Sequence, residues 1–310
     1  MDRPAPLIII TGPTGCGKTG LAFTLAHDHP LEVVSADSMQ VYRGMDIATA
    51  KPTHLERKRL PHHLVDIRNP DETFDAGSFA TLAMEAIERI RSRGNIPLIV
   101  GGTGLYIKVL LYGLCQAPSR SETLRRILRN ISANKGTRRL WDYLARLDPP
   151  TADKVSPKDE ARLIRYLEII FLSGRTPSTL HSRHGFSQPS LEAGIFCLAP
   201  QRETLYAAID TRVIAMLENG IVPETERLLR MGYSRDLAPM KALAYKHVLA
   251  YLAEEISLDT AVLRIQRDTR RYAKRQLTWN RGNYNPSCFY DQDSALKAID
   301  RLLKNQNPAP

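Results

Sequence analysis

The sequence lacks paired cysteines and long apolar runs. Its four cysteines, Cys16, Cys115, Cys197 and Cys288, lie far apart and form no C-x-x-C pair. This spacing disfavours a zinc site or a disulfide framework and is typical of the reducing cytosol. No run of about 18 apolar residues is present to predict a membrane-spanning helix. The first residues lead straight into an apolar strand, without room for a signal peptide. We therefore expect a cytoplasmic protein without a membrane anchor.

The sequence has too few acidic residues to balance its basic ones. Lysine and arginine number 43 against 33 aspartates and glutamates, a net charge of +10. Residues 116–190 hold 14 of the basic and 7 of the acidic residues, so a quarter of the chain carries most of the excess. A second basic cluster lies at 264–281. A localised excess favours a polyanionic partner such as nucleic acid, whereas a solvated basic surface is the plainer alternative.

Hydrophobic patterning indicates an α/β fold. Short, mostly β-branched runs predict strands at 7–11, 32–35, 64–67, 97–102, 195–199 and 288–291. Helical patterns separate them at 17–27, 77–93, 103–113, 201–219 and 257–280. This alternation predicts a P-loop NTPase-like, mostly parallel sheet flanked by helices. Residues 116–190 show only helical spacing, so we expect an all-helical insertion there, between a first part of the core at 1–115 and its completion with C-terminal helices at 191–310.

The stretch GPTGCGKT at 12–19 matches the phosphate-loop pattern G-x-x-x-x-G-K-[ST] between a predicted strand and a predicted helix. Glycines allow backbone N–H groups to turn toward an anion, and the helix dipole adds to the attraction. Lys18 supplies a mobile positive charge and Thr19 a hydroxyl for Mg²⁺, the cofactor we expect. The loop predicts a nucleotide site, for example for ATP, or a diphosphate site formed by Gly12, Pro13, Thr14, Gly15, Cys16, Gly17, Lys18 and Thr19.

An acidic residue follows the next strand. Ligands of parallel sheets bind at the carboxyl ends of the strands, so Asp37 is expected to share a crevice with the phosphate loop. A carboxylate there suits a general base, although capping a turn is the ordinary role of such an aspartate. Asp66 is the other candidate for an acid beside the phosphates. Arg212 is a candidate second clamp on the diphosphate, with a surface arginine as the alternative.

Five motifs in order carry a resemblance to a known family: GPTGCGKT, DSMQVYRGMDIATAKP, PHHLVDI, VGGTGLY and AKRQLTWNR. Over about 7–290 the chain resembles the bacterial type of tRNA dimethylallyltransferase, also called tRNA isopentenyltransferase. The resemblance implies transfer of the dimethylallyl group from dimethylallyl diphosphate to N6 of the adenosine next to the anticodon (position 37). The substrates would be tRNAs that read codons beginning with U, and diphosphate would be released.

The resemblance also implies roles for single residues. Asp37 would be the catalytic base, and Lys18, Thr19 and Thr103 would belong to the catalytic group. Where the family commonly has glycine, this chain has Ala244. The basic C-terminal helical pattern suggests further phosphate contacts by Lys274 and Arg275. The residues implied to contact tRNA are Asp37, Ser38, Met39, Gln40, Thr103, Arg125, Asp159, Glu160, Ala161, Arg162, Leu163, Met240, Lys241, Ala242, Leu243, Ala244 and Tyr245.

Other functions remain open from the residues. A prenyl transferase acting on free adenylate, or a P-loop kinase acting on a small molecule, would keep the loop and Asp37 but would not need the basic insertion. A non-enzymatic RNA-binding protein would explain the charge but not the loop beside Asp37. We expect a monomer whose partners are the anticodon stem-loop of tRNA and dimethylallyl diphosphate.

Overall fold

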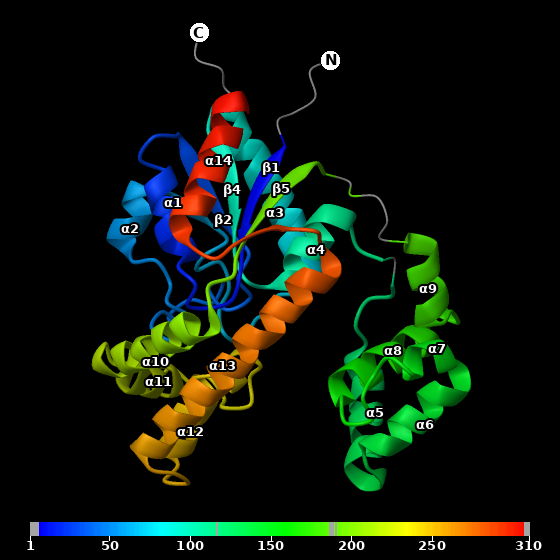
Figure 1. Cartoon of the computed structure of the whole chain (residues 1–310). Coiled ribbons are helices and arrows are strands. Elements are labelled where there is room, and N and C mark those ends of the chain that lie inside the picture. Colours follow the sequence, from blue (N-terminus) through cyan, green and yellow to red (C-terminus); the bar gives the residue numbers. More distant parts are fainter. Residues whose placement is uncertain (1–5, 116, 186–188, 190, 307–310) are drawn as a thin grey trace. The chain divides into compact units, whose positions relative to one another are not determined.

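The computed structural model describes residues 6–115, 117–185, 189 and 191–306 (Figure 1). The chain divides into two compact units, one made of Met1–Leu111 with Leu191–Pro310 and the other of Tyr112–Ser190. We call the first the core unit and the second the insertion unit. The insertion unit begins at Tyr112, a few residues before the predicted boundary at 116.

A six-stranded sheet with the order β3-β2-β4-β1-β5-β6 forms the centre of the core unit. All its strand pairs are parallel, so the predicted α/β fold is confirmed. Because the strands are parallel, their carboxyl ends meet at one edge of the sheet, where such folds bind ligands. The strands are β1 (Leu7–Thr11), β2 (Leu31–Ser35), β3 (His62–His63), β4 (Ile96–Val100), β5 (Ala193–Leu198) and β6 (Ser287–Phe289).

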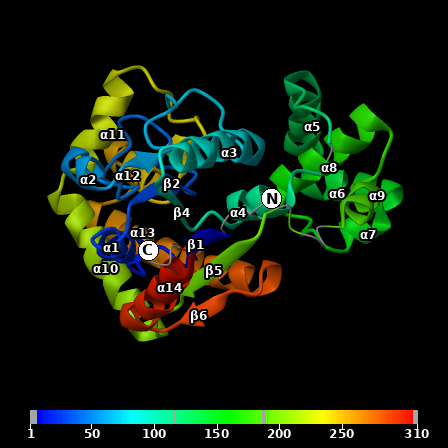
Figure 2. The ribbon, with the colours of Figure 1, turned by 90° about the horizontal axis from the view of Figure 1, so that it is seen from above.

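Helices cover both faces of this sheet, as its uninterrupted apolar strands require. Figure 2 shows α3 (Ala76–Ser92) and α4 (Gly104–Tyr112) on one face and α1 (Lys18–Leu25) and α14 (Gln292–Gln306) on the other. Successive side chains of β1 point to opposite faces of the sheet. Ile8 and Ile10 pack in one apolar cluster with residues of α1 and α14.

The strand predicted at 64–67 is wrong. The third strand is the short β3 before it, and the chain turns immediately afterwards because Leu64 and Asp66 adopt left-handed conformations, with φ of 63° and 56°. Such residues do not continue a strand. The backbone N–H of Asp66 instead donates to the carbonyl of Gln40 (3.1 Å), which joins this turn to the segment after β2.

Except for α2 (His54–Arg59), the remaining helices of the core unit gather beyond the carboxyl ends of the strands (Figure 1). The long helix α13 packs against both α10 and α12. These elements are α10 (Arg202–Glu218), α11 (Ile221–Arg230), the 3₁₀ turn η1 (Pro239–Lys241), α12 (Tyr245–Leu252) and α13 (Leu258–Asn283).

The insertion unit is helical throughout its described part. Its apolar cluster joins α5, α6, α7 and α8, with Leu140, Leu144, Leu163 and Leu167 fully buried. Its helices are α5 (Glu122–Lys135), α6 (Thr137–Leu147), α7 (Pro149–Ala152), α8 (Glu160–Ser173) and α9 (Pro177–His184). Among all helices that the structure describes, none is long and apolar enough to cross a lipid bilayer.

Candidate active site

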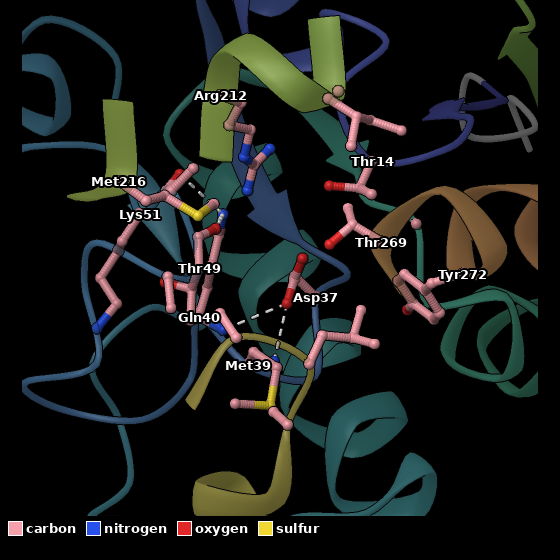
Figure 3. Close-up of a pocket in the computed structure, with 18 of the residues that line it drawn as sticks. Thr14, Asp37, Met39, Gln40, Thr49, Lys51, Arg212, Met216, Thr269 and Tyr272 are labelled. Carbon is pink, nitrogen blue, oxygen red and sulfur yellow. Dashed lines mark hydrogen bonds between the residues drawn. The ribbon is translucent and has the colours of Figure 1, made fainter. Parts of the chain in front are cut away.

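A cavity of about 770 Å³ lies at the carboxyl edge of the sheet, within the core unit. Its walls come from the phosphate loop, the segment after β2, and helices α10 and α13 (Figure 3). Fourteen of the residues predicted for the site line it together, although they come from four separate parts of the sequence. They are Thr14, Gly15, Gly17, Lys18, Thr19, Asp37, Ser38, Met39, Gln40, Arg212, Ala242, Leu243, Ala244 and Tyr245.

The phosphate loop connects β1 to α1. Gly12, Gly15 and Gly17 have φ of 143°, 82° and 89°, values that glycine adopts without strain. A side chain at Gly12 would also collide with the carbonyl oxygen of Leu198, because a Cβ there would lie 2.4 Å from it. Lys18 Nζ donates to the carbonyls of Gly12 (3.0 Å) and Pro13 (2.8 Å), so its charge lies at the loop.

Asp37 lies in the cavity, where a general base was expected, and it also caps a turn. Its Oδ1 accepts hydrogen bonds from the backbone N–H groups of Met39 (2.8 Å) and Gln40 (3.3 Å) (Figure 3). These bonds fix the carboxyl group in orientation. No described residue donates to Oδ2, which therefore has the lone pairs to accept a proton from a ligand in the cavity.

Thr103 holds the turn that contains Asp37. Its Oγ1 accepts from the backbone N–H of Ser38 (3.0 Å), and its own N–H donates to the carbonyl of Ala36 (3.1 Å). These two bonds hold Ala36 and Ser38, the residues on either side of Asp37. Thr103 thereby positions the carboxylate from the loop after β4.

Arg212 projects from α10 toward the cavity (Figure 3). Its Nε is buried and has no hydrogen-bond partner among the described residues. Burial lowers the pKa of Arg212, and the Asp37 carboxylate opposes this effect. An arginine stays protonated at neutral pH even so. A half-buried cation whose Nε is unsatisfied, beside a phosphate loop, fits an anionic ligand.

The residues present also fit a magnesium ion bound together with a phosphate ligand. Mg²⁺ usually takes one or two protein oxygens and completes its shell with phosphate and water. Thr19 and Asp37 offer such oxygens in the cavity. Asp66, the other candidate acid, is engaged by Lys51 (2.6 Å) and Arg57 (2.7 Å) instead. Within the described ranges, no group of three or more His, Cys, Asp or Glu forms a ready metal site.

Comparison with known proteins identifies the family. The model of the family described as IPP transferase matches residues 40–283. The chain is 50% identical over 273 residues to tRNA dimethylallyltransferase 2 of Geotalea uraniireducens, covering 88% of each chain. The chain belongs to the tRNA dimethylallyltransferase family.

Solved structures agree with this family. The tRNA isopentenylpyrophosphate transferase of Bacillus halodurans is 37% identical and superimposes with a TM-score of 0.70, covering 97% of this chain and 96% of its own. A eukaryotic dimethylallyltransferase described as acting on tRNA is 28% identical, with a TM-score of 0.81 over 99% of this chain and 80% of its own. The prediction of a tRNA dimethylallyltransferase is thus confirmed at the level of the family.

Two motifs used for the family resemblance, VGGTGLY and AKRQLTWNR, turn out to contact each other. A Cβ at Gly102 would lie 2.3 Å from Gln276 Nε2, and a Cβ at Gly104 would lie 2.1 Å from the Trp279 ring. Both glycines are therefore needed for α13 to approach the loop after β4. Trp279 is partly buried, and its indole N–H donates to the Tyr284 hydroxyl (3.0 Å).

Gln276 also lines the cavity, and the sequence did not reveal its contacts. Its buried side chain accepts from the backbone N–H of Thr14 (2.8 Å) and donates to the carbonyl of Gly102 (2.8 Å). It thus joins the phosphate loop to the loop after β4. The signal was present, because Gln276 lies in a motif shared with the family, but the motif does not tell what the residue contacts.

Replacing Gln276 by leucine is expected to destabilise the core unit by about 1–3 kcal/mol for each backbone group that loses its partner. The Michaelis constant for the donor should also rise, because Thr14 belongs to the phosphate loop. Urea unfolding and steady-state kinetics measure the two effects. Gln266→Leu on the same helix is the control, since Gln266 makes only a 3.4 Å bond to the carbonyl of Asp210. Equal effects of the two substitutions would contradict this role.

A buried lysine and a buried glutamate shape the floor of the cavity, and sequence reasoning missed both. Lys51 Nζ donates to the Tyr42 carbonyl, Asp46 and Asp66, each at 2.6 Å. Glu224 accepts from the backbone N–H groups of Asp46 and Ile47, both at 2.9 Å. These bonds hold the segment that contains Thr49 and Ala50. The backbone carbonyls of these two residues each accept a hydrogen bond from the side-chain amide of Gln40, at 3.4 Å.

The segment Met240–Tyr245 enters the cavity through its last four residues. Ala244 has φ of −82° and ψ of −47°, an ordinary helical conformation, so alanine is accommodated where the family commonly has glycine. Tyr245 is buried and its hydroxyl donates to Glu224 (2.7 Å). Burial raises the pKa of Tyr245. Its side chain thus supports the wall of the cavity.

Three further residues of α13 line the cavity without having been predicted for the site, namely Ile265, Thr269 and Tyr272. Burial, together with the Asp37 carboxylate, raises the pKa of Tyr272 to about 12, so it is an uncharged phenol at neutral pH. Lys274 and Arg275 are exposed on the same helix and do not line this cavity.

The predicted tRNA contacts of the insertion unit divide into buried and exposed residues. Arg125 forms two bonds to the fully buried Glu168, both at 2.8 Å, and Leu163 belongs to the apolar cluster. Both side chains hold the unit together. Asp159 caps α8 by accepting from the Arg162 backbone (3.2 Å). Glu160, Ala161 and Arg162 are exposed.

Proposed function

We propose that this chain transfers the dimethylallyl group from dimethylallyl diphosphate to N6 of adenosine 37 in tRNAs that read codons beginning with U, and releases diphosphate. One observation above all supports this: a single cavity is lined by the phosphate loop, the Arg212 cation and the Asp37 carboxylate. Its relatives carry the name of this activity. The proposal places the reaction in the cytosol and has the chain act as a monomer.

The first part of the proposed reaction is departure of diphosphate. The N6 nitrogen attacks C1 of the dimethylallyl group while the bond from C1 to the diphosphate oxygen breaks, and diphosphate leaves with the electron pair. Backbone N–H groups of the phosphate loop, Lys18 and Arg212 stabilise the negative charge that collects there. Thr19 would help to hold Mg²⁺, which supplies further charge stabilisation when bound.

The second part is removal of a proton from the nucleophile. The adenine amino group is a weak nucleophile because its lone pair is delocalised into the ring. As N6 gains positive charge, its proton passes to Oδ2 of Asp37, which the turn and Thr103 hold toward the cavity. No nucleoside triphosphate is consumed, so the reaction does not need a second acid beside the phosphates.

The proposed RNA contacts extend over both units. The target base must leave its stack to reach an enclosed cavity, and loop bases are the ones proteins read by their edges. Asp37, Ser38, Met39, Gln40 and Thr103 would meet the adenine, with residues 240–245 beside it. The basic insertion unit would bind the anticodon stem through exposed residues of α5 and α8, and Lys274 and Arg275 would contact phosphates.

The experiment that tests this function offers the chain several acceptors and donors. Unmodified tRNA, AMP and small alcohols are each incubated with dimethylallyl diphosphate or with ATP, and the products are analysed by mass. We expect prenylated tRNA from dimethylallyl diphosphate without any ATP. Prenylated AMP alone would indicate the adenylate transferase, and a phosphorylated product from ATP would indicate a kinase. Either result would overturn the proposal.

A further inference from the structure

One wall of the cavity is formed by α10 and is mostly apolar, and that wall begins at the phosphate loop. Ile209, Val213 and Met216 lie on one stripe of α10 and line the cavity. The stripe starts beside the loop, since a Cβ at Gly15 would lie 3.1 Å from the Ile209 side chain. Arg212 lies between Ile209 and Met216 and also faces the cavity.

The length of this stripe, from Ile209 to Met216, follows from the geometry of an α-helix. Met216 follows Ile209 by seven positions, which corresponds to about 10 Å along a helix that rises about 1.5 Å per residue. An extended dimethylallyl diphosphate, a diphosphate with a five-carbon tail, is about as long as this stripe. With the diphosphate on the loop and Arg212, the apolar tail would reach the end of the stripe at Met216.

Met216 is suited to close that end. It lies in a buried apolar cluster with Val213, Ala244 and Ile265, and the same cluster includes Ile221 and Val248, which do not line the cavity. Met216 keeps 8% of its surface exposed, whereas Val213 and Ile265 are more completely buried. Figure 3 shows its side chain reaching from α10 toward the cavity on the same side as Arg212, with Thr269 and Tyr272 on the other.

We propose that Met216 limits the length of the prenyl donor. This inference rests on the proposed function and adds the residue that excludes a ten-carbon allylic diphosphate from a site that takes the five-carbon one. A second isoprene unit would have to pass Met216 into the packed cluster behind it. Pockets of this kind discriminate by size, at about 10–200-fold for a single methylene group.

The test measures kcat/KM for dimethylallyl and geranyl diphosphate on the same unmodified tRNA. For Met216→Ala we expect the ratio of geranyl to dimethylallyl transfer to rise more than tenfold, because shortening the side chain opens the end of the stripe. For Met216→Phe we expect a lower kcat/KM for dimethylallyl diphosphate with an unchanged KM for tRNA. The matched control is Met231→Ala, since Met231 is 63% exposed and lies outside the cavity lining.

Each outcome separates this inference from the proposed function. If Met216→Ala still prenylates tRNA but keeps the donor ratio of the unsubstituted chain, the length limit is wrong and the function stands. If the unsubstituted chain prenylates tRNA with neither donor, the function itself is wrong and the inference falls with it. Thermal unfolding establishes that each variant is folded. Met216→Leu, which conserves apolar character with a shorter reach, replaces the alanine variant if that variant does not fold, and the same rise in the ratio is expected.

Discussion

Replacing Asp37 by asparagine is expected to lower the turnover number by about 10²–10⁴, the usual contribution of a general base. Asparagine can keep the turn, because its side-chain oxygen can accept from Met39 and Gln40 as Oδ1 does now. It cannot take the proton from N6. Single-turnover prenylation of tRNA measures the chemical step, and tRNA binding is expected to be unchanged.

Asp37→Ala separates the two roles of this carboxyl group. Alanine removes both the base and the cap, so a loss of stability of about 1 kcal/mol should accompany the loss of turnover. Comparing urea unfolding of the two variants isolates the cap, while single-turnover rates should fall similarly in both. If Asp37→Asn kept the turnover of the unsubstituted chain, Asp37 would have only a structural role.

Replacing Glu168 by glutamine is expected to destabilise the insertion unit by about 3–5 kcal/mol, the typical effect of breaking a buried ion pair. Glu168 is fully buried and accepts from Arg125, Arg165 and the backbone of Ser121. The Arg125 side chain is only 12% exposed and would lose its counter-charge. Hydrogen exchange of peptides from Tyr112–Ser190 in the full chain measures the effect.

A second carboxylate of the same unit provides the control for this prediction. Glu122 is 73% exposed and lies 3.7 Å from Arg129. An exposed pair of this kind contributes about 0–1 kcal/mol, so Glu122→Gln should leave exchange nearly unchanged. Similar protection in both variants would show that the buried pair adds little to the stability of the unit.

The Glu168 carboxylate also makes the stability of the insertion unit depend on pH under acidic conditions. Burial alone raises the pKa of Glu168, but hydrogen bonds from Arg125, Ser121 and Arg165 outweigh it and lower the pKa to about 2 from its ordinary 4.5. Because the folded-state pKa is depressed, the stabilisation is fully present above pH 4.5 and is lost as pH falls toward 2. The unsubstituted unit should therefore lose protection in that window, whereas Glu168→Gln should lack this contribution at any pH.

Much of the candidate site could be predicted from the sequence, because short local patterns determine where several of its residues lie. A strand, a glycine loop and a helix place Lys18 and Thr19 wherever this motif folds. The parallel sheet then places Asp37 at the same edge, and Arg212 of α10 does line the cavity as predicted. These predictions depended on short segments and on one rule of sheet topology.

Contacts between distant segments could not be predicted in this way. Lys51, Glu224 and Gln276 act on partners far away in the sequence or on backbone groups, and no local spacing indicates such partners. The strand at 64–67 failed for a related reason. Its apolar residues suit a strand, but Leu64 and Asp66 take left-handed conformations in which the turn contacts the Gln40–Val41 backbone.

The bonds of Gln276 have a consequence for synthesis of the protein on the ribosome. The residue that fixes Thr14 follows it by 262 positions, so the phosphate loop leaves the exit tunnel long before its partner is translated. The insertion unit, by contrast, makes its contacts within one continuous segment and can fold as soon as it emerges. The nascent chain would thus acquire its helical insertion first and complete its donor site only near the end of translation.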